Sequence, residues 1–394
     1  MKNIKYTTVL SLLLAFMLIF TLGGCDENSQ NGDGNDVDTD LAEDVAEELE
    51  DDDNEINYEA TYNKDLAGTT INVFNWGEYI PDGTEGSLDI NKVFTELTGI
   101  KINYTTYESN ESMYSKLKGG GVSYDIIIPS DYMIERMRKE GMLKEINTAG
   151  LSNYKYIDKR YKNLYFDKEN SYSVPYCVGM VGIIYNTSVV KEKPDSWGIM
   201  WDEKYTDNIL NFNNPRDAFA TAQLLLGFDL NSLNRAQWDI AAEKLKEQKA
   251  ILQSYVMDEI YQKMEDGEAA IAPYYAGDFL LMQENNPDLE FTYPKEGVNI
   301  FVDSICIPKS SKNYEAAMTY INFLLEPEIA LEIAEYVMYA SPHTAVVNSD
   351  DYSLKGNEYL YPKEEEYPKV QYFHDIDEGI RIYYERLWED VKLF

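Results

Sequence analysis

Apolar and polar residues between positions 69 and 142 form alternating strand-like and helix-like stretches. Apolar runs or strict alternation predict three strands, at 69–73, 101–107 and 124–129. Apolar residues at helical spacing predict three helices, at 88–98, 113–118 and 133–142. Strands that alternate with helices in this way predict a parallel sheet with helices packed on its faces.

A second region of the same kind follows a long apolar run at 173–186, which is long enough to cross between two lobes. The pattern predicts strands or extended segments at 209–212, 269–275 and 301–308, and helices at 218–226, 234–248, 314–325 and 383–387. The chain from residue 60 onward has about 335 residues, which is too many for one hydrophobic core. We therefore predict an α/β body of two lobes.

The amino terminus has the pattern of a cleaved leader. Lys2 and Lys5 precede an apolar run from Val9 to Leu22, which is shorter than the ~20 residues of a membrane-spanning helix. The small residues before Cys25 resemble a bacterial lipobox, which implies a signal peptide over 1–24 and lipidation of Cys25. An ordinary secretory leader with an incidental cysteine is the alternative. We expect Cys25 to be the only membrane anchor.

Residues 25–59 have the composition of an acidic, disordered tether. Positions 26–59 contain sixteen Asp or Glu residues and no Lys or Arg. Such a segment cannot bury enough apolar surface to fold, and its like charges keep it extended. Asp51 to Asp53 lack the glycine and spacing of a calcium-binding loop, so we expect a solvated spacer.

The predicted folded body is acidic in its own right. The chain has 34 basic and 70 acidic residues, and residues 60–394 contain 32 basic and 54 acidic residues, a net charge of −22. This charge argues against nucleic acid as a partner, because affinity for phosphate depends on basic contacts. It suits a cationic ligand through long-range attraction.

Cysteine and histidine are too few to indicate a disulfide scaffold or a metal site. Cys177 and Cys306 are the two cysteines of the body, and we expect them to be buried free thiols, although their spacing leaves a bridge open. His343 and His374 have no partners at metal-ligand spacing. We expect no metal and no cofactor.

Residues 74–79 are the first candidate site. Trp76, Glu78 and Tyr79 follow a predicted strand, where open α/β sheets place their ligand crevices. Aromatic faces beside a carboxylate suit an organic cation. Burial of the two aromatic side chains for packing alone is the alternative.

Five stretches resemble the polyamine-binding proteins of spermidine/putrescine ABC importers. They are Asn75-Trp76-Gly77-Glu78-Tyr79 and the segments at 106–114, 124–130, 303–308 and 321–327. The resemblance runs from about residue 69 to the chain end. It implies a two-lobed periplasmic-binding-protein-like (type II) fold with a mixed, mainly parallel sheet in each lobe and a hinge between them. Lobe 1 would comprise 66–175 and 304–335, and lobe 2 would comprise 176–303 and 336–394.

Matched position by position, the resemblance implies ligand contacts from both lobes. The implied ligand-binding residues are Trp76, Glu78, Tyr79, Ser130, Tyr132, Asp217, Tyr275, Asp278, Phe301, Asp303 and Tyr339. Asp303 is the predicted main anchor for an ammonium group. Asn214 stands where spermidine-preferring members often have an aspartate, and Gln371 corresponds loosely to a family glutamine.

Several of these residues also have structural interpretations. Asp217 would suit the first turn of a helix, and a lone acid at 278 or 303 would more often cap a turn. Any single tyrosine in a chain with 33 of them is more often packing than pocket. Glu108 and Glu111 fit helix-start residues, as in a capping box.

The resemblance implies a lipid-anchored, extracytoplasmic receptor, monomeric and not an enzyme. It would bind putrescine and/or spermidine between its lobes and deliver the ligand to an ABC permease. A receptor for another small cationic metabolite is the first alternative. An extracellular hydrolase that uses paired carboxylates such as Asp278 and Asp303 is the second, although no motif of a nucleophile or of a metalloprotease is present.

Overall fold

The computed structural model describes residue 62 and residues 64–394. The predicted signal peptide, the lipidated Cys25 and the acidic tether lie outside these residues. Residues Tyr58–Phe394 form one compact unit. Over the described range, no helix combines the length and the apolar character that a bilayer crossing requires.

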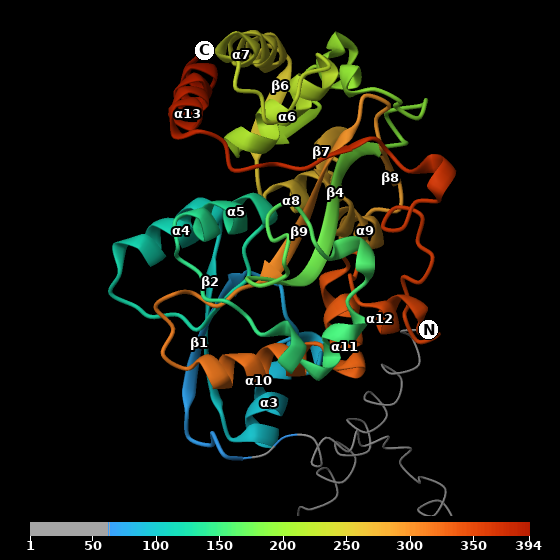
Figure 1. Cartoon of the computed structure of the whole chain (residues 1–394). Helices are drawn as coiled ribbons and strands as arrows, with labels where there is room; N and C mark the ends of the chain where they lie inside the picture. The colour runs from blue at the N-terminus through green and yellow to red at the C-terminus, as the bar shows by residue number, and fades with distance from the viewer. Residues whose placement is uncertain (1–61, 63) are drawn as a thin grey trace, which may run out of the picture. The chain divides into compact units, whose positions relative to one another are not determined.

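The first sheet has three parallel strands in the order β2-β1-β3 (Figure 1). They are β1 (Thr70–Trp76), β2 (Lys101–Tyr107) and β3 (Ile126–Ile127). Five helices accompany them: α3 (Ile90–Thr98), α4 (Asn110–Gly119), α5 (Asp131–Lys139), α10 (Tyr314–Leu324) and α11 (Pro327–Val337). The predicted parallel sheet is confirmed, with a third strand shorter than the apolar run at 124–129.

The pleat of β1 buries both of its faces. Ile71 and Val73 join one core with Phe94 of α3 and Tyr320 of α10, whereas Phe74 joins the other core. Successive side chains of a strand point to opposite faces, so a strand covered on both sides reads as a continuous apolar run. In β1 the burial is continuous only from Val73 to Asn75, whereas residues 70–73 still alternate between polar and apolar.

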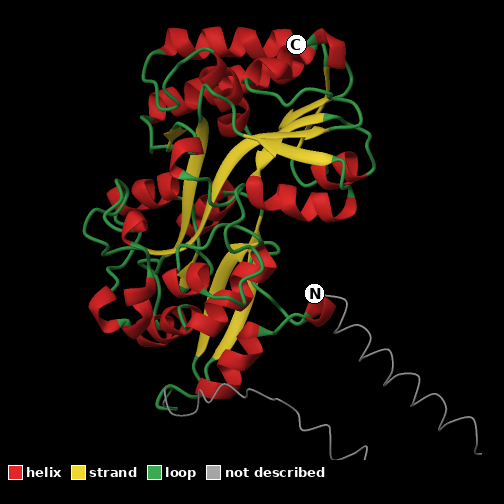
Figure 2. Cartoon of the chain, turned by 90° about the vertical axis from the view of Figure 1, so that its right-hand side faces the viewer, coloured by secondary structure: helices red, strands yellow, loops and turns green. Residues whose placement is uncertain are grey.

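The second sheet is mixed, in the order β10-β9-β4-β7-β5-β6, with β8 also paired to β4. Its strands are β4 (Val174–Asn186), β5 (Ile209–Phe212), β6 (Leu252–Val256), β7 (Ile271–Tyr275), β8 (Leu289–Thr292), β9 (Val298–Ile305) and β10 (Val370–Gln371). Its helices are α6 (Pro215–Leu225), α7 (Arg235–Lys249), α8 (Ile260–Glu265), α9 (Ala276–Asn285) and α13 (Glu378–Leu393), and the short α12 (Thr344–Asn348) packs against α11. Helices lie on both sides of the strands (Figure 2). Antiparallel pairing is more common here than the pattern indicated, because β4 runs antiparallel to β7, β8 and β9.

Two long antiparallel strands, β4 and β9, connect the two sheets (Figure 1). All thirteen residues of β4 are buried, as expected for a run that crosses the body. Isolated bridges join Ser130 to Asp303, within β9, and Ile127 to Cys306, directly after it. Gly179 allows the close pairing, since a Cβ there would lie 2.2 Å from the Phe301 ring. The crossing predicted for residues 173–186 is therefore present.

Local capping explains where the helix boundaries differ from the prediction. α4 begins at Asn110 because the Ser109 side chain accepts from the Ser112 N–H and the Ser112 hydroxyl accepts from the Ser109 N–H. The capping box therefore uses two serines and neither Glu108 nor Glu111, contrary to the interpretation from sequence. α6 begins at Pro215 because the Asn214 side chain caps it, and proline is well suited to a first helical position.

Candidate ligand-binding site

Asp303 lies on the strand that joins the two sheets. Its side chain is buried, and the Tyr79 hydroxyl donates to its Oδ2 at 2.7 Å. Its other oxygen, Oδ1, is buried without a hydrogen-bond partner. Burial raises the pKa of Asp303 to about 6, because the carboxylate loses water there, and the Tyr79 and Ser130 hydroxyls only partly oppose that shift.

Asp278 lies in the first turn of α9 and accepts two tyrosine hydroxyl hydrogen bonds, from Tyr261 and from Tyr339. Burial raises the pKa of this carboxyl as well, and the two hydroxyls oppose that shift. Gly277 makes room for the arrangement, because a Cβ at this position would lie 2.6 Å from the Tyr339 ring.

Asp217 lies in the first turn of α6, the place that its structural interpretation predicted. Its Oδ2 accepts from the Asn214 side chain at 2.6 Å and from the Tyr275 hydroxyl at 3.4 Å. Burial raises the pKa of Asp217 to about 7. Asn214 therefore serves as both a helix cap and a partner of Asp217.

None of these three carboxylates forms an ion pair with a lysine or arginine of residues 62 and 64–394. Arg216 is next to Asp217 in the chain, but its guanidinium donates to Asn231 at 2.8 Å and lies 4.5 Å from the Phe373 ring centre. Buried carboxylates are usually paired with a cation, because an isolated charge is costly in a low-dielectric interior. The site thus offers negative charge to a cation from outside the chain.

A line of aromatic rings connects the carboxylates. Tyr275 lies 5.5 Å from Phe301, Phe301 lies 6.1 Å from Tyr339, and Tyr339 lies 6.1 Å from Tyr79, measured between ring centroids. Trp76 follows at 6.4 Å from Tyr79. The hydroxyls of the first, third and fourth rings reach Asp217, Asp278 and Asp303, so acids lie at three points along the aromatic wall.

Comparison with known proteins identifies the family. The profile of the bacterial extracellular solute-binding proteins matches residues 90–358. The spermidine/putrescine-binding periplasmic protein of Salmonella typhimurium is 34% identical over 318 residues, which cover 80% of this chain and 90% of that protein. The chain belongs to the bacterial extracellular solute-binding proteins. Within them, it is a member of the spermidine/putrescine-binding group.

Solved structures agree with this assignment. A putative spermidine/putrescine ABC transporter protein from Listeria monocytogenes is 35% identical, with a TM-score of 0.77, and the match covers 82% of this chain and 99% of that one. A spermidine/putrescine transporter substrate-binding protein from Streptococcus pneumoniae is 32% identical, with a TM-score of 0.71 and the same coverage. The predicted two-lobed α/β fold is confirmed.

Three further residues of this solute-binding protein were implied as ligand contacts. Trp76 belongs to the line of aromatic rings, whereas Ser130 and Glu78 lie outside that line. The Trp76 indole donates to the Ile128 carbonyl at 2.8 Å, which fixes the ring beside Tyr79. Ser130 is buried beside Asp303, and its hydroxyl accepts from the Asn110 side chain at 3.0 Å. Glu78 is exposed, has a positive φ of 49°, and accepts from Tyr336 at 2.8 Å. Glu78 is therefore exposed, unlike Asp217 and Asp303.

Three residues of the site were not predicted. Asp131 is fully buried, accepts from the Val302 N–H at 3.3 Å, and has its pKa raised by burial and by the charge of Asp303. The Cys177 sulfur lies 2.6 Å from the Tyr79 hydroxyl oxygen. The Tyr261 hydroxyl donates to Asp278. Asp131 follows Ser130 directly at a strand end, which is a signal that sequence reasoning could have used.

The two remaining predictions concern Cys306 and Gln371. Cys177 and Cys306 are both buried free thiols, as expected, and burial raises the pKa of each. The Gln371 side chain accepts from the Leu230 N–H at 3.1 Å, a contact that fixes backbone near α6.

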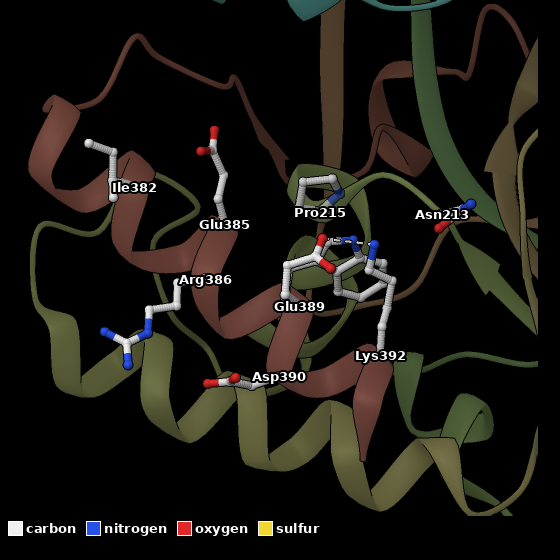
Figure 3. Close-up of a pocket in the computed structure, with 9 residues that line it drawn as sticks. Asn213, Pro215, Ile382, Glu385, Arg386, Glu389, Asp390 and Lys392 are labelled. Carbon is white, nitrogen blue, oxygen red and sulfur yellow. Dashed lines mark ion pairs between the residues drawn. The ribbon is translucent and has the colours of Figure 1, made fainter.

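A separate cavity of about 710 Å³ lies along α13 (Figure 3). It is lined by Asn213, Pro215, Ile382, Glu385, Arg386, Trp388, Glu389, Asp390 and Lys392. None of the carboxylates Asp217, Asp278 and Asp303 lines it. Glu389 and Lys392 form an ion pair at 2.9 Å there, so part of its charge is already compensated.

Proposed function

We propose that this protein is an extracytoplasmic receptor that binds a polyamine, putrescine and/or spermidine, between its lobes. It then delivers the ligand to the permease of an ABC importer. The observation that carries the proposal is a set of three carboxylates, the buried Asp217 and Asp303 and the half-buried Asp278, which have no ion-pair partner among the described residues and are connected by an aromatic wall.

The chemistry of a polyamine fits this arrangement. Each ammonium has three N–H donors and no acceptor, so it needs acceptors and prefers anionic ones. The methylene chain gains free energy when it is buried against flat apolar faces, and the rings add cation–π attraction. The free Oδ1 of Asp303 would accept from one ammonium, with Tyr79 keeping Oδ2 in place.

The names of the relatives support this ligand class. Relatives from Salmonella typhimurium and Escherichia coli are named spermidine/putrescine-binding periplasmic proteins, and a Pseudomonas aeruginosa relative is named a putrescine-binding periplasmic protein. We infer that the ligand leaves the protein chemically unchanged. We also infer a monomer anchored through Cys25, with the tether as spacer and with lobe boundaries near residues 175, 303 and 335.

The crossing strands suit a hinge. β4 and β9 link the two sheets, and ligand contacts would come from both sides of that link. A ligand that contacts both sides would favour a closed arrangement, which the permease would recognise.

Calorimetric titration of the full chain with putrescine, spermidine and spermine tests the proposal. We expect binding of at least one amine at a 1:1 ratio, and no binding of 1,4-butanediol, which has a similar chain without the charges. Recovery of the unchanged amine would separate a receptor from a hydrolase. The proposal fails if none of the three amines binds. Binding of a different organic cation in that case would favour the first alternative.

A further inference from the structure

The segment that joins β10 to α13 contacts elements of both sheets. On the second-sheet side, the Asn231 amide donates to the Tyr372 carbonyl at 2.8 Å and accepts from the His374 N–H at 2.7 Å. The Arg216 guanidinium, from α6, donates to the His374 carbonyl at 3.3 Å. These hydrogen bonds fix the backbone of residues 372–374 to the part of the second region around α6.

Helix α5, which accompanies the first sheet, contacts the same segment (Figure 1). The Lys139 ammonium pairs with Asp375 at 3.2 Å, and the Asp375 N–H donates to the Glu135 side chain at 2.9 Å. The Tyr165 hydroxyl, from the chain before β4, donates to the Phe373 carbonyl. The segment therefore joins the first sheet to the second without being part of the crossing strands β4 and β9.

The charges of this contact are complementary and partly withdrawn from water. Lys139 also pairs with Glu135 at 2.9 Å, and Arg381 of α13 lies 3.8 Å from the other oxygen of Asp375. The Glu135 and Asp375 side chains are only 12% and 17% exposed. An isolated exposed ion pair contributes little to stability, whereas several linked charges, with a backbone N–H donor on one carboxylate, contribute more.

Helix α5 also carries one of the implied ligand contacts. Tyr132 lies in its first turn, about one turn before Glu135. The Tyr132 ring packs edge-on against Phe373, with centroids 6.3 Å apart, and its hydroxyl donates to Glu111 at 2.9 Å. A single rigid helix therefore connects the edge of the candidate site with the contact to the segment before α13.

We propose that Glu135, Lys139 and Asp375 form a latch, called the α5 latch below, that holds the first sheet to the second and thereby raises the affinity for the ligand. The inference rests on the proposed function, in which a ligand that contacts both sides favours a closed arrangement. Within the described part of the chain, none of the three latch residues bonds to a carboxylate of the candidate site. The latch therefore acts on the arrangement of the two sheets and not on the ligand itself.

The position of the latch determines how its loss affects binding. Contacts that span two linked parts of a protein raise the population of the arrangement in which the parts meet. A ligand that binds only this arrangement has its affinity reduced in proportion to the fraction of molecules that adopt it. Loss of the latch therefore weakens the binding of every amine by the same factor, whereas loss of a residue that contacts the ligand can affect a diamine and a triamine differently.

Titration of Lys139→Met, Asp375→Asn and the double variant of the full chain with putrescine and spermidine tests the latch. Both substitutions remove a charge at nearly constant side-chain volume, and Asp375→Asn keeps the N–H that donates to Glu135. We expect each single variant to bind both amines about three- to tenfold more weakly, by the same factor for each amine. The double variant should lose no more than about twofold beyond either single variant, because both changes break the same ion pair.

Lys355→Met is the matched control. Lys355 is 42% exposed, against 47% for Lys139, and it also forms a close ion pair, with Asp350 at 2.6 Å. This pair lies within one short stretch of chain and joins no separate parts of the protein. The variant should change neither affinity by more than about twofold.

Small-angle X-ray scattering adds a measurement that needs no ligand. We expect ligand-free Asp375→Asn to have a larger radius of gyration than the unmodified chain, and the amine-saturated proteins to have equal radii. Affinities of both single variants within about twofold of the unmodified chain would overturn the latch and leave the proposed function intact. Losses that differ by more than about threefold between the two amines would do the same. If the unmodified chain binds no polyamine, the proposed function fails and scattering decides on the latch: equal radii of the ligand-free proteins overturn it, and a larger radius of Asp375→Asn supports it.

Discussion

The two sides of the candidate site differ in what they contribute. The first sheet supplies aromatic and hydroxyl groups, such as Trp76, Tyr79 and Ser130, at the ends of its parallel strands. The second sheet and the crossing strand β9 supply the buried Asp217 and Asp303 and the half-buried Asp278. The three carboxylates therefore come from one part of the chain, whereas the aromatic wall is shared, because Tyr275 and Phe301 belong to β7 and β9.

The largest expected effect comes from the charged side. Asp303→Asn should weaken polyamine binding by on the order of 2–5 kcal/mol, because it removes a buried charge partner of the ammonium. Titration calorimetry measures the change, with Asp195→Asn, a change at an exposed aspartate, as the control. A change below about 0.5 kcal/mol would show that Asp303 is not the main ammonium contact. The carboxylates that bind the ligand would then lie elsewhere in the protein.

The strand that links the two sides is tested by Gly179→Ala. The added Cβ would lie 2.2 Å from the Phe301 ring, so the ring or β4 must move. We expect a loss of about 1–3 kcal/mol in the free energy of unfolding, measured by urea denaturation. Gly119→Ala, whose Cβ would meet nothing within 4 Å, should cost far less. Equal stability of the two variants would contradict the close approach of β4 to β9.

The pH dependence of binding distinguishes the carboxylate side from the aromatic side. Asp303 and Asp217, with pKa values of about 6 and about 7, are partly protonated in the free protein at pH 6 and must lose their protons to pair with ammonium. We expect affinity to rise by about tenfold or more between pH 5 and pH 8. Calorimetry in buffers of different ionisation enthalpy should detect proton release at pH 6 and almost none at pH 8.5.

The same pKa values give the sign of the effect on stability. A carboxyl whose pKa is higher in the folded state than in the unfolded state stabilises the fold at low pH. That stabilisation is fully present below the unfolded pKa, near 3.8, and is lost as the pH rises through the folded pKa values, about 6 for Asp303 and about 7 for Asp217. Asp217→Asn should therefore flatten the fall in unfolding temperature of the ligand-free protein between pH 5 and pH 8. A fall of the same size in variant and parent would mean that Asp217 does not titrate in this range.

The smallest expected effect comes from the aromatic side. Tyr79→Phe keeps the ring in the wall and removes the hydroxyl that donates to Asp303 at 2.7 Å. We expect binding to weaken by about 0.5–1.5 kcal/mol, because the ammonium can take over the vacated acceptor. A loss as large as that of Asp303→Asn would mean that the two sides are not separable.

Sequence periodicity predicted the first sheet well because its elements are local. Gly99 ends α3 with a φ of 73°, as its position after the last apolar residue indicated. The pattern did not predict α9, because β7 passes directly from Tyr275 into Ala276 without a polar break. It also could not predict β10, which has two residues and exists only through its pairing with β9.

Sequence reasoning named the carboxylates Asp217, Asp278 and Asp303 but not the contacts that other elements make with the site. The hydroxyl of Tyr261 reaches Asp278 from α8, and Val302 donates to Asp131 from β9, contacts that depend on how the elements pack. Glu111 was interpreted from its neighbours in the chain, and its contact with Tyr132 becomes visible only when α4 and α5 lie side by side. The sequence therefore allowed single residues of the site to be predicted, whereas hydrogen bonds between residues on different helices and strands could not be predicted from it.

The return of the chain to the first sheet has a consequence for folding. Ile71 and Phe94 pack in the same core as Tyr320 and Phe323, which are more than two hundred residues later in the chain. The amino-terminal half therefore cannot complete its core during synthesis until β9 has crossed back and α10 has emerged. Such long-range closure slows folding and leaves apolar surface exposed in the meantime. A chain that must leave the cell before it folds would benefit from that delay.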